Sequence, residues 1–415
     1  MAHGQSRICT HSRGMNEITI IGGGLVGGTL ALGLAQHGFS VTVIDAHAKG
    51  DQSRHDFDGR SYALAQSSVR LLTVLGLWAD LQAHAQPILQ VKASDGRAGQ
   101  GPAPWHLHFD HGELGQGPMG FMAEDRFVRR ALASALSDTP NITQIFNHTV
   151  VAQDGGTVTL DNGKTITAQM IVGCDGRQSG TATRAGIKRR ISDYGQTALV
   201  CAIDHTLPHD GIAHQFFMPE GPLAILPLPG NRSSIVWSDT TQRATAINAL
   251  NDAEYLQFLR PRFGDFLGDI SLTGARFTYP LTLTMAQTMT APRLALAGDA
   301  AHGMHPIAGQ GLNLGLRDVA TLIEVLTLAK RRGEDFTAAD VLQRYADWRH
   351  FDCTTMAAAT DGFKRLFSND NAILRPLRDL GMAVVSSAPG LRRAFMREAA
   401  GVSGDLPRLL QGKTV

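Results

Sequence analysis

Three glycines near the start of the chain constrain its fold more than any other feature. Gly22, Gly24 and Gly27 have the spacing G-x-G-x-x-G within the stretch ITIIGGGLVGGTLALGLAQHGFSVTVID. A run rich in β-branched residues precedes them, an apolar helical pattern follows, and a second apolar run ends in Asp45. Short apolar runs of this kind are typical of buried strands. The order strand, glycine-rich turn, helix and strand therefore predicts a Rossmann-type unit whose turn is a dinucleotide-binding fingerprint.

Each of the three glycines has its own physical role in such a turn. Gly22 permits the tight turn, Gly24 lets the backbone approach a pyrophosphate, and Gly27 lets the helix pack closely on the strand. The N-terminus of the helix offers N–H donors and partial positive charge to the phosphates. Asp45 can accept hydrogen bonds from a ribose diol. The alternative interpretation is a glycine-rich turn that binds no ligand, and the motif alone does not separate NAD from FAD.

Two later strands end in turns that combine an acid with glycine. An apolar run at 170–173 leads to Cys174-Asp175-Gly176, and another at 294–297 leads to Gly298-Asp299. A carboxylate at the carboxyl end of a strand in such a sheet can hold ribose or ribityl hydroxyls. Both acids are therefore expected at the edge that binds one shared cofactor. For Asp175 a second interpretation stands beside this one, in which the acid stabilises the fold of its own turn.

A further glycine-rich segment begins an apolar helix in the sequence IAGQGLNLGLRDV at 307–319. A helix start normally takes a side-chain cap, and glycine there costs conformational entropy. The segment instead offers the bare backbone of Gly309, Gln310 and Gly311. We infer that a ligand requires these N–H groups.

Together these motifs resemble the class A FAD-dependent aromatic monooxygenases, which have the para-hydroxybenzoate-hydroxylase fold, and within them most closely the ubiquinone-biosynthesis hydroxylase family. The resemblance covers nearly the whole chain after Met15, although 190–285 matches mainly by spacing. Its most specific part is the run HPIAGQGLNLG. The matching segments are the G-x-G-x-x-G start, DGRSYALAQSSVRLL at 58–72, EDRFVRRALASAL at 124–136, the turn at 175–176, the run from 298 to 319, and the tail SGDLPRLLQGK.

The resemblance implies an α/β fold with a discontinuous Rossmann-like FAD-binding domain, an inserted β-rich substrate domain and a helical C-terminal region. A hairpin is expected in LAILPLPGNRSSIVWS, around Pro229-Gly230-Asn231. The expected boundaries are 15–77, 105–188 and 288–330 for the FAD-binding domain, 78–104 and 189–287 for the substrate domain, 331–415 for the helical region, and 1–14 for a disordered tail or tag.

The resemblance also implies a reaction. NAD(P)H, as a transient co-substrate, would reduce FAD, and dioxygen would then form a C4a-hydroperoxide that hydroxylates the aromatic ring of a polyprenylated phenol in ubiquinone biosynthesis. Ile225, Leu226 and Phe216 suit an apolar substrate, and they suit a plain core equally well. Two alternatives remain open: a class A hydroxylase of a soluble aromatic acid, and a non-catalytic flavin-bearing subunit of a ubiquinone-synthesis complex.

The resemblance assigns roles to individual residues. The backbone at Gly309–Gly311 would lie against the pyrimidine edge of the flavin, where N–H donors stabilise negative charge and a side chain would block the ring. The expected cofactor-binding residues are Gly22, Gly24, Gly27, Asp45, Arg60, Arg126, Asp175, Asp299, Gly309, Gln310, Gly311, Leu312 and Asn313, and the expected catalytic residues are Pro306, Arg60 and His305.

Some of these residues have a plainer interpretation. Arg60 can be a cation of a surface loop, and Arg126 can be a solvated residue on an exposed helix face. The pair His302-x-x-His305 suggests a metal site, but no further ligand pair at a suitable spacing accompanies it beyond Asp299. We expect no metal, and we interpret the two histidines as polar lining of the flavin pocket.

Charge and composition bound the partners. The net charge of +1 gives no drive toward nucleic acid. The chain has four widely spaced cysteines and no apolar run long enough to span a membrane, which fits a cytoplasmic enzyme. Residues 364–413 carry nine basic and four acidic residues mixed with apolar ones. This C-terminal region is expected either to meet a membrane surface or another ubiquinone-synthesis protein, or to pack on the body with solvated arginines.

Overall fold

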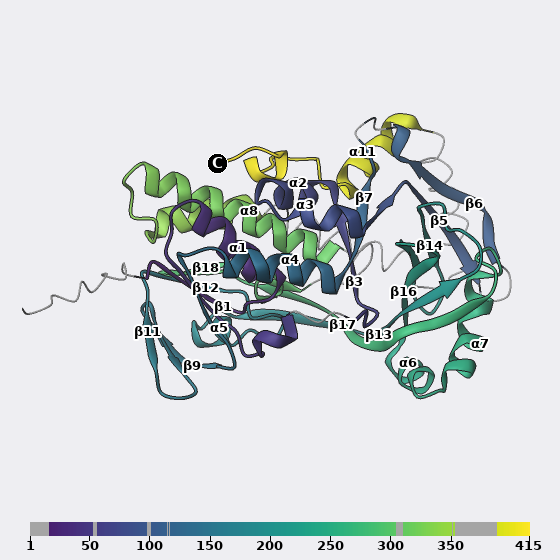
Figure 1. Cartoon of the computed structure of the whole chain (residues 1–415), viewed down its shortest axis with the longest axis horizontal. Coiled ribbons are helices and arrows are strands. Elements are labelled where there is room, and N and C mark those ends of the chain that lie inside the picture. Colours follow the sequence, from purple (N-terminus) through teal and green to yellow (C-terminus); the bar gives the residue numbers. More distant parts are fainter. Residues whose placement is uncertain are drawn as a thin grey trace, which may run out of the picture.

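A computed structural model describes residues 16–52, 56–97, 101–113, 115, 117–303, 310–350, 352 and 388–415. The chain forms two lobes (Figure 1). One lobe holds a six-stranded, mainly parallel sheet with helices packed on it, and the other holds an eight-stranded sheet. The α/β architecture with a parallel cofactor-type sheet, a β-rich lobe and a helical C-terminal segment confirms the fold expected from the sequence.

The six-stranded sheet has the order β18-β19-β12-β1-β2-β8. Its central strand β1, Ile18–Ile21, pairs in parallel with β2, Val41–Ile44, on one side and with β12, Met170–Gly173, on the other. Every residue of these three strands is buried. Continuous apolar runs of this kind are what a parallel sheet covered on both faces requires. The carboxyl ends of these strands therefore lie together at one edge.

Helix α1, Leu25–Gln36, packs between α4, Asp125–Ser137, and α8, Gln310–Arg331. Glycines allow the close approach on both sides. A Cβ on Gly33 would lie 2.2 Å from Ile323 of α8, and one on Gly28 would lie 2.8 Å from Leu132 of α4. These two contacts place α4, α1 and α8 in one helical layer on the sheet (Figure 1).

The eight-stranded sheet has the order β20-β17-β13-β16-β15-β14-β5-β6. Its longest strands, β13 at Arg189–His205 and β17 at Ile270–Ala286, run along both lobes (Figure 1). The expected hairpin is confirmed: β15, Leu223–Leu228, pairs with β16, Arg232–Thr240, and Leu228 stands opposite Arg232. The expected domain boundary at 105 falls inside β6, Gly101–Asp110, and the division into domains stays a prediction.

The two faces of this sheet have different partners. Helices α6, Thr241–Asn248, and α7, Asp252–Phe263, cover one face, and Phe216 and Ile225 belong to the apolar cluster beneath them. Leu226 belongs to a different cluster, which joins the opposite face to a three-stranded sheet of the first lobe. Of the three apolar residues considered for substrate, Phe216 and Ile225 are therefore core, and only Leu226 faces the junction between the lobes.

Among the described residues, no helix combines the length and the apolarity needed to cross a membrane.

The remaining elements complete the two lobes. Their bounds are β3 Ser61–Ala65, β7 Gly120–Glu124 and β4 Ala85–Ile88 in the three-stranded sheet, α2 Gln66–Val74, α3 Trp78–Leu81, β5 Gln90–Arg97, β8 Ile142–Ile145, β9 Val150–Asp154, β10 Thr157–Leu160, β11 Thr165–Thr167, α5 Gly180–Arg184, β14 Ile212–Phe217, β18 Thr290–Ala291, β19 Leu294–Leu296, β20 His302–Gly303, α11 Pro389–Ala399, and the short helices η1 Lys49–Gln52, η2 Gln82–His84, η3 His111–Glu113, η4 Gly298–Ala300 and η6 Arg408–Gln411.

Candidate functional site

The glycine-rich turn joins β1 to α1, and its three glycines meet different surroundings. Gly22 has φ +101°, and a Cβ there would lie 2.4 Å from the carbonyl oxygen of Cys174. A Cβ on Gly27 would lie 1.9 Å from the carbonyl oxygen of Gly22. A Cβ on Gly24, in contrast, would meet no atom within 4 Å. The first and third glycines are required by backbone packing, whereas the second borders open space.

The start of α1 fits a phosphate. Its N-cap is Gly24, which makes no side-chain capping hydrogen bond, and the first turn contains no acid. The N–H groups at a helix start have no partner within the helix, and together with the helix dipole they favour an anion. The open space beside Gly24 and these donors form a cradle that a side chain at this position would fill.

Asp45 follows β2 and is held beside this turn. It is buried, with Oδ2 accepting a hydrogen bond from the N–H of Gly23 at 2.8 Å and Oδ1 accepting one from the N–H of His47 at 2.8 Å. The carboxylate is thus fixed at the carboxyl end of β2, next to the cradle. Its role toward a ribose stays a prediction.

Asp299 lies at the end of β19, in the short helix η4. Gly298 before it has φ +63°, and the Asp299 side chain is 38% exposed, with Oδ2 at 3.1 Å from Nε of Arg177. Because this carboxylate is accessible, it can accept hydrogen bonds from ligand hydroxyls. The sheet therefore places Asp45 and Asp299 at its carboxyl edge, on strands separated by β1 and β12.

The start of α8 contributes backbone and one buried amide. A Cβ on Gly311 would meet no atom within 4 Å, so this backbone is open as the flavin interpretation requires. Leu312 is half-buried against the core. The Asn313 amide accepts hydrogen bonds from the Ala65 N–H and the Ser68 hydroxyl, both at 2.8 Å, and donates one to the Ala63 carbonyl at 2.9 Å. These contacts fix α8 to β3 and α2, and a direct contact from Asn313 to a flavin stays a prediction.

Four expected site residues have little or no description. His305, Pro306 and Gly309 lie outside the described residues, and for Gln310 the structure describes the backbone at the start of α8. Their roles stay predictions.

Asp175 acts within its own turn. One carboxylate oxygen accepts from the Ser179 hydroxyl, and the other accepts from the N–H of Thr181 at 2.9 Å and from its hydroxyl at 2.8 Å. These bonds tie the end of β12 to the first turn of α5. The geometry supports the interpretation of Asp175 as a fold element.

Arg60 lies at the junction of the lobes. It pairs with Asp58 at 2.6 Å and with the buried Asp125 at 3.3 Å, and its guanidinium lies 5.7 Å from the ring centre of Phe277 in β17. Burial lowers the pKa of Arg60, but its hydrogen bonds to the Asp58 carboxylate and the charge of Asp125 outweigh burial and raise the pKa above its ordinary value. Arg60 is therefore a held cation and not a mobile surface group.

Arg126 belongs to a second cluster that sequence reasoning missed. Its Nε lies 2.7 Å from Glu124, a carboxylate that is only 4% exposed, and Arg232 of the other lobe approaches Glu124 at 3.9 Å. Both guanidiniums lie over the ring of Phe57, at 5.8 Å and 4.7 Å. The sequence offered one signal for this cluster, the position of Glu124 beside Arg126 in the EDRF motif. Phe57 and Arg232 lie far away in the sequence, so nothing linked them to it.

His302 is buried, and its Nε2 lies 2.6 Å from Oδ2 of Asp318. Within the part of the chain that the structure describes, no group of three His, Cys, Asp or Glu side chains is arranged to hold a metal ion. Asp318 and its partner Arg349 were also missed, although both lie in helical segments that the sequence pattern indicated.

These features define a class of protein. A glycine-rich turn with an open helix start, two acids on one sheet edge and a second open helix start are the parts of a dinucleotide-type cofactor site, joined here to a large β-sheet lobe. The site residues fit FAD.

Comparison with known proteins gives the family. Residues 15–356 match the family described as the FAD binding domain. The chain is 44% identical over 403 residues to ubiquinone hydroxylase UbiL of Rhodospirillum rubrum, covering 95% of this chain and 92% of that protein. It is 36% identical to the 3-demethoxyubiquinol 3-hydroxylase of Escherichia coli, covering 93% and 98%. The p-nitrophenol 4-monooxygenase PnpA of Pseudomonas putida shares the fold, with a TM-score of 0.76, 19% identity, and coverage of 94% and 98%. The chain belongs to the FAD-binding monooxygenase family.

Proposed function

We propose that this protein is an FAD-dependent NAD(P)H monooxygenase that hydroxylates the aromatic ring of a polyprenylated phenol in ubiquinone biosynthesis. The observation that carries the proposal is the similarity to two ubiquinone hydroxylases along almost the full length of both. Fold alone would not suffice, because one fold hosts many reactions.

The site residues support flavin chemistry in a defined way. The cradle at Gly24 would receive the pyrophosphate, Asp45 would hold the ribose, and Asp299 would hold the ribityl chain. The open backbone at Gly311, at the start of α8, would stabilise negative charge on the flavin ring. Bound FAD supplies electron transfer from NAD(P)H and the activation of dioxygen. One oxygen atom enters the phenol ring and the other leaves as water, with NAD(P)H providing two electrons.

Several residues support a substrate site at the junction of the lobes. Leu226 from the eight-stranded sheet packs there with Phe57 and Met119. Arg60 lies at the same junction, where it can face the reacting ring. Apolar side chains at this junction suit the prenyl chain of such a phenol, and the neighbouring charged groups, Arg60 with Asp58 and Arg126 with Glu124, would face its polar ring.

The alternative of a soluble aromatic acid has less support. Such a substrate needs an arginine to bind its carboxylate. Arg232, on the sheet at the junction, is already paired with Asp204 at 2.7 Å and lies near Glu124. These two carboxylates already compensate the charge of Arg232, which makes Arg232 a poor binding partner for the carboxylate of a substrate.

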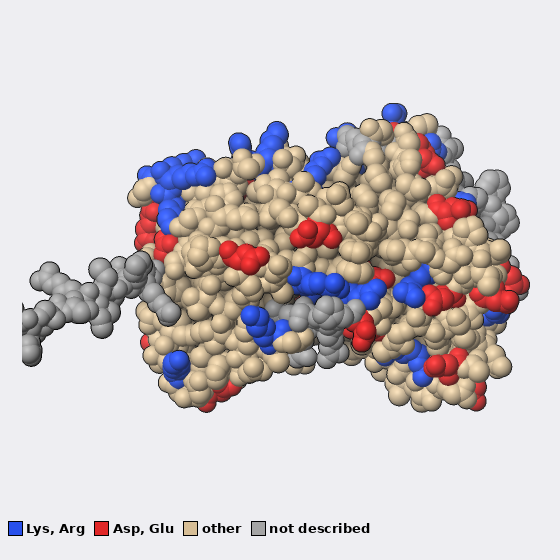
Figure 2. Space-filling view, in the orientation of Figure 1, with Lys and Arg blue, Asp and Glu red and all other residues tan. Residues whose placement is uncertain are grey.

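A peripheral position at the inner face of the cytoplasmic membrane is part of the proposal, because a polyprenyl chain resides in the bilayer. In α11, Leu391 and Phe395 lie one turn apart and are 43% and 42% exposed, and Arg393 and Arg397 are exposed on the same helix. Figure 2 shows Lys and Arg along the upper edge of the molecule, where Figure 1 places α8 and α11. Apolar anchors beside cations are the pattern of helices that lie on anionic membranes.

Sedimentation with vesicles of phosphatidylglycerol and phosphatidylethanolamine tests the membrane part. The double variant Leu391→Ser with Phe395→Ser is expected to lose most of the binding. Phe258→Ser, which alters a 45% exposed phenylalanine on α7, is expected to bind like the wild type. Equal binding by all three proteins would contradict a role for α11.

The enzymatic part is tested by NADPH oxidation in the FAD-loaded protein. A short-chain prenylphenol is expected to accelerate oxidation, whereas 4-hydroxybenzoate is expected to have little effect. Acceleration by the acid alone would favour the soluble-acid alternative. Acceleration by neither, in a protein that holds FAD, would favour the non-catalytic subunit.

A further inference from the structure

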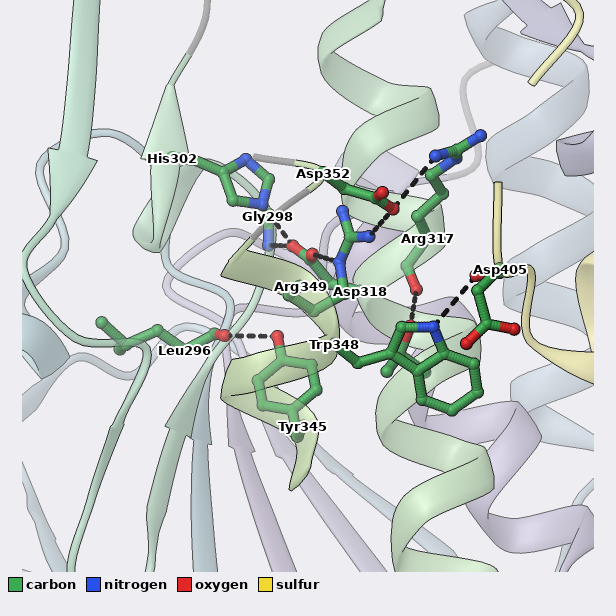
Figure 3. A network of polar contacts seen from close by, with 11 residues as sticks. Leu296, Gly298, His302, Arg317, Asp318, Tyr345, Trp348, Arg349, Asp352 and Asp405 are labelled. Atoms are coloured by element: carbon green, nitrogen blue, oxygen red, sulfur yellow. Dashed lines mark hydrogen bonds and ion pairs between the residues drawn. The ribbon is translucent and has the colours of Figure 1, made fainter. Parts of the chain in front are cut away.

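A buried network of charges holds the turn at residues 298–302, which follows β19 (Figure 3). Its centre is Asp318 on α8, which has no exposed side-chain surface. Oδ2 of Asp318 accepts a hydrogen bond from the Gly298 N–H at 2.8 Å and lies 2.6 Å from Nε2 of His302. Oδ1 accepts a hydrogen bond from Nε of Arg349 at 2.7 Å. One carboxylate therefore binds both ends of the turn 298–302 and a cation from a third segment.

The network extends to the C-terminal part of the chain. Arg349, 1% exposed, donates from Nη1 to Asp352 at 2.5 Å, and Arg317 donates to the same carboxylate at 3.0 Å. Arg317 also donates to the carbonyl of Gly401 at 3.0 Å. Asp318 of α8 thus holds the turn 298–302, and its neighbour Arg317 holds the C-terminal segment at Gly401.

Charges buried this deeply persist only when they are paired and hydrogen-bonded. Burial alone would raise the pKa of Asp318, but the His302 and Arg349 side chains outweigh it and hold the pKa below its usual range. The carboxylate is therefore ionised at neutral pH, when its hydrogen bonds to the turn are strongest.

The turn that Asp318 holds carries a cofactor residue. Asp299 is adjacent to Gly298, whose N–H is bound to Asp318, and packing reinforces the placement of this glycine. A Cβ on Gly298 would lie 3.1 Å from Val26 of α1, and one on Gly315 of α8 would lie 2.8 Å from the same side chain. The turn 298–302 therefore packs between α1 and α8, the two helices whose open starts are proposed to bind FAD.

We propose that Asp318 is a positioning residue for FAD, which fixes the turn 298–302, and with it Asp299, relative to the open start of α8. Asp318 does not itself touch the cofactor in this account. It sets the distance between the Asp299 carboxylate and the Gly311 backbone, which in the proposed site hold the ribityl chain and the pyrimidine edge of the flavin.

The test compares two buried carboxylates on the same helix. Asp318→Asn keeps the shape of the side chain but removes its charge. We expect the dissociation constant of FAD to rise by ~10–100-fold, which is the typical loss of metal affinity when a residue that orients a metal ligand is mutated. Glu324→Gln is the control, because Glu324 is 8% exposed and accepts a hydrogen bond from the Arg408 N–H at 2.6 Å, which ties α8 to the C-terminal turn η6. This variant is expected to bind FAD like the wild type.

FAD affinity is measured by titrating the apoprotein, and the melting temperature of each apoprotein is measured alongside. A positioning role predicts that Asp318→Asn binds FAD more weakly and alters the visible circular dichroism of the flavin. Both changes should exceed those in Glu324→Gln, even where the melting temperatures of the two variants fall equally. Unchanged affinity in Asp318→Asn, or equal weakening in both variants, would overturn the proposal. If the Asp318→Asn apoprotein does not fold, His302→Leu, which removes the donor toward Asp318, takes its place and is expected to weaken FAD binding more than Glu324→Gln does.

These measurements are independent of the phenol. A wild-type chain that binds FAD tightly but hydroxylates no prenylphenol would contradict the proposed function and leave the role of Asp318 standing.

Discussion

A Cβ on Gly22 would lie 2.4 Å from the carbonyl oxygen of Cys174, so the first glycine of the turn touches the backbone at the end of the neighbouring strand. Two segments far apart in the sequence thus meet at the cofactor edge, because β1 pairs in parallel with β12. Only a residue without a side chain permits this contact, and the φ of +101° adds a second reason for glycine.

Gly22→Ala is expected to destabilise the apoprotein by about 3 kcal/mol, because overpacking against a backbone carbonyl combines with backbone strain. Urea unfolding of the apoprotein measures the effect. A variant as stable as the wild type would mean that β1 and β12 are farther apart than described.

Gly24→Val is expected to behave in the opposite way. The Cβ position is open, so the apoprotein should fold normally, but the side chain would occupy the cradle for the pyrophosphate. FAD affinity, followed by flavin fluorescence, should fall by more than a hundredfold, about 3 kcal/mol. Tight FAD binding by Gly24→Val would place the phosphates elsewhere.

Asp45→Ala is expected to weaken FAD binding by about 1–3 kcal/mol, the worth of one or two hydrogen bonds to a charged acceptor. It should also reduce the stability of the apoprotein, because the N–H groups of Gly23 and His47 lose their acceptor. Calorimetric titration with FAD separates the two effects. A loss of stability with no loss of FAD affinity would leave Asp45 a purely structural role.

His214 on β14 is expected to make the protein sensitive to acid. Burial, assisted by the charge of Lys92, lowers the pKa of His214 from 6.5 to about 4. Because the unfolded chain binds this proton more readily, stability is present above pH 6.5 and is lost as the pH falls toward 4, by about 3 kcal/mol.

The measurement is unfolding of wild type and His214→Leu at pH 7.5 and pH 4.5. The variant should lose less stability than the wild type between these values, whereas His111→Leu, which alters a half-exposed histidine, should lose as much. Parallel losses in all three proteins would assign the acid sensitivity to other groups.

The parts of the fold that follow from sequence are the local ones. The turn at Gly22–Gly27, the hairpin around Gly230 and the fold class were predictable because periodicity and turn residues act over a few positions. The parallel pairing of β14 with β5, at Ile212 with Gln90, was not, because neither strand carries a signal for a partner so distant.

The candidate site divides in the same way. Gly24, Asp45 and Asp299 stand at strand ends, where motif spacing points to them. Glu124 and Asp318 escaped notice, because their importance depends on partners brought together by the tertiary fold, and a buried carboxylate next to a distant arginine leaves no pattern in a single sequence. For Asp175 the sequence left a cofactor role and a structural role open, and the contacts with Ser179 and Thr181 favour the structural one.

The most direct test of the central claim is the fate of dioxygen. The FAD-loaded protein would be incubated with NADPH, a short-chain prenylphenol and ¹⁸O₂, and the product analysed by mass spectrometry. The account predicts a hydroxylated phenol with one ¹⁸O atom, formed in step with NADPH oxidation. Oxidation of NADPH with no labelled phenol, whether or not the substrate is present, would contradict the assignment of this chain as a phenol hydroxylase.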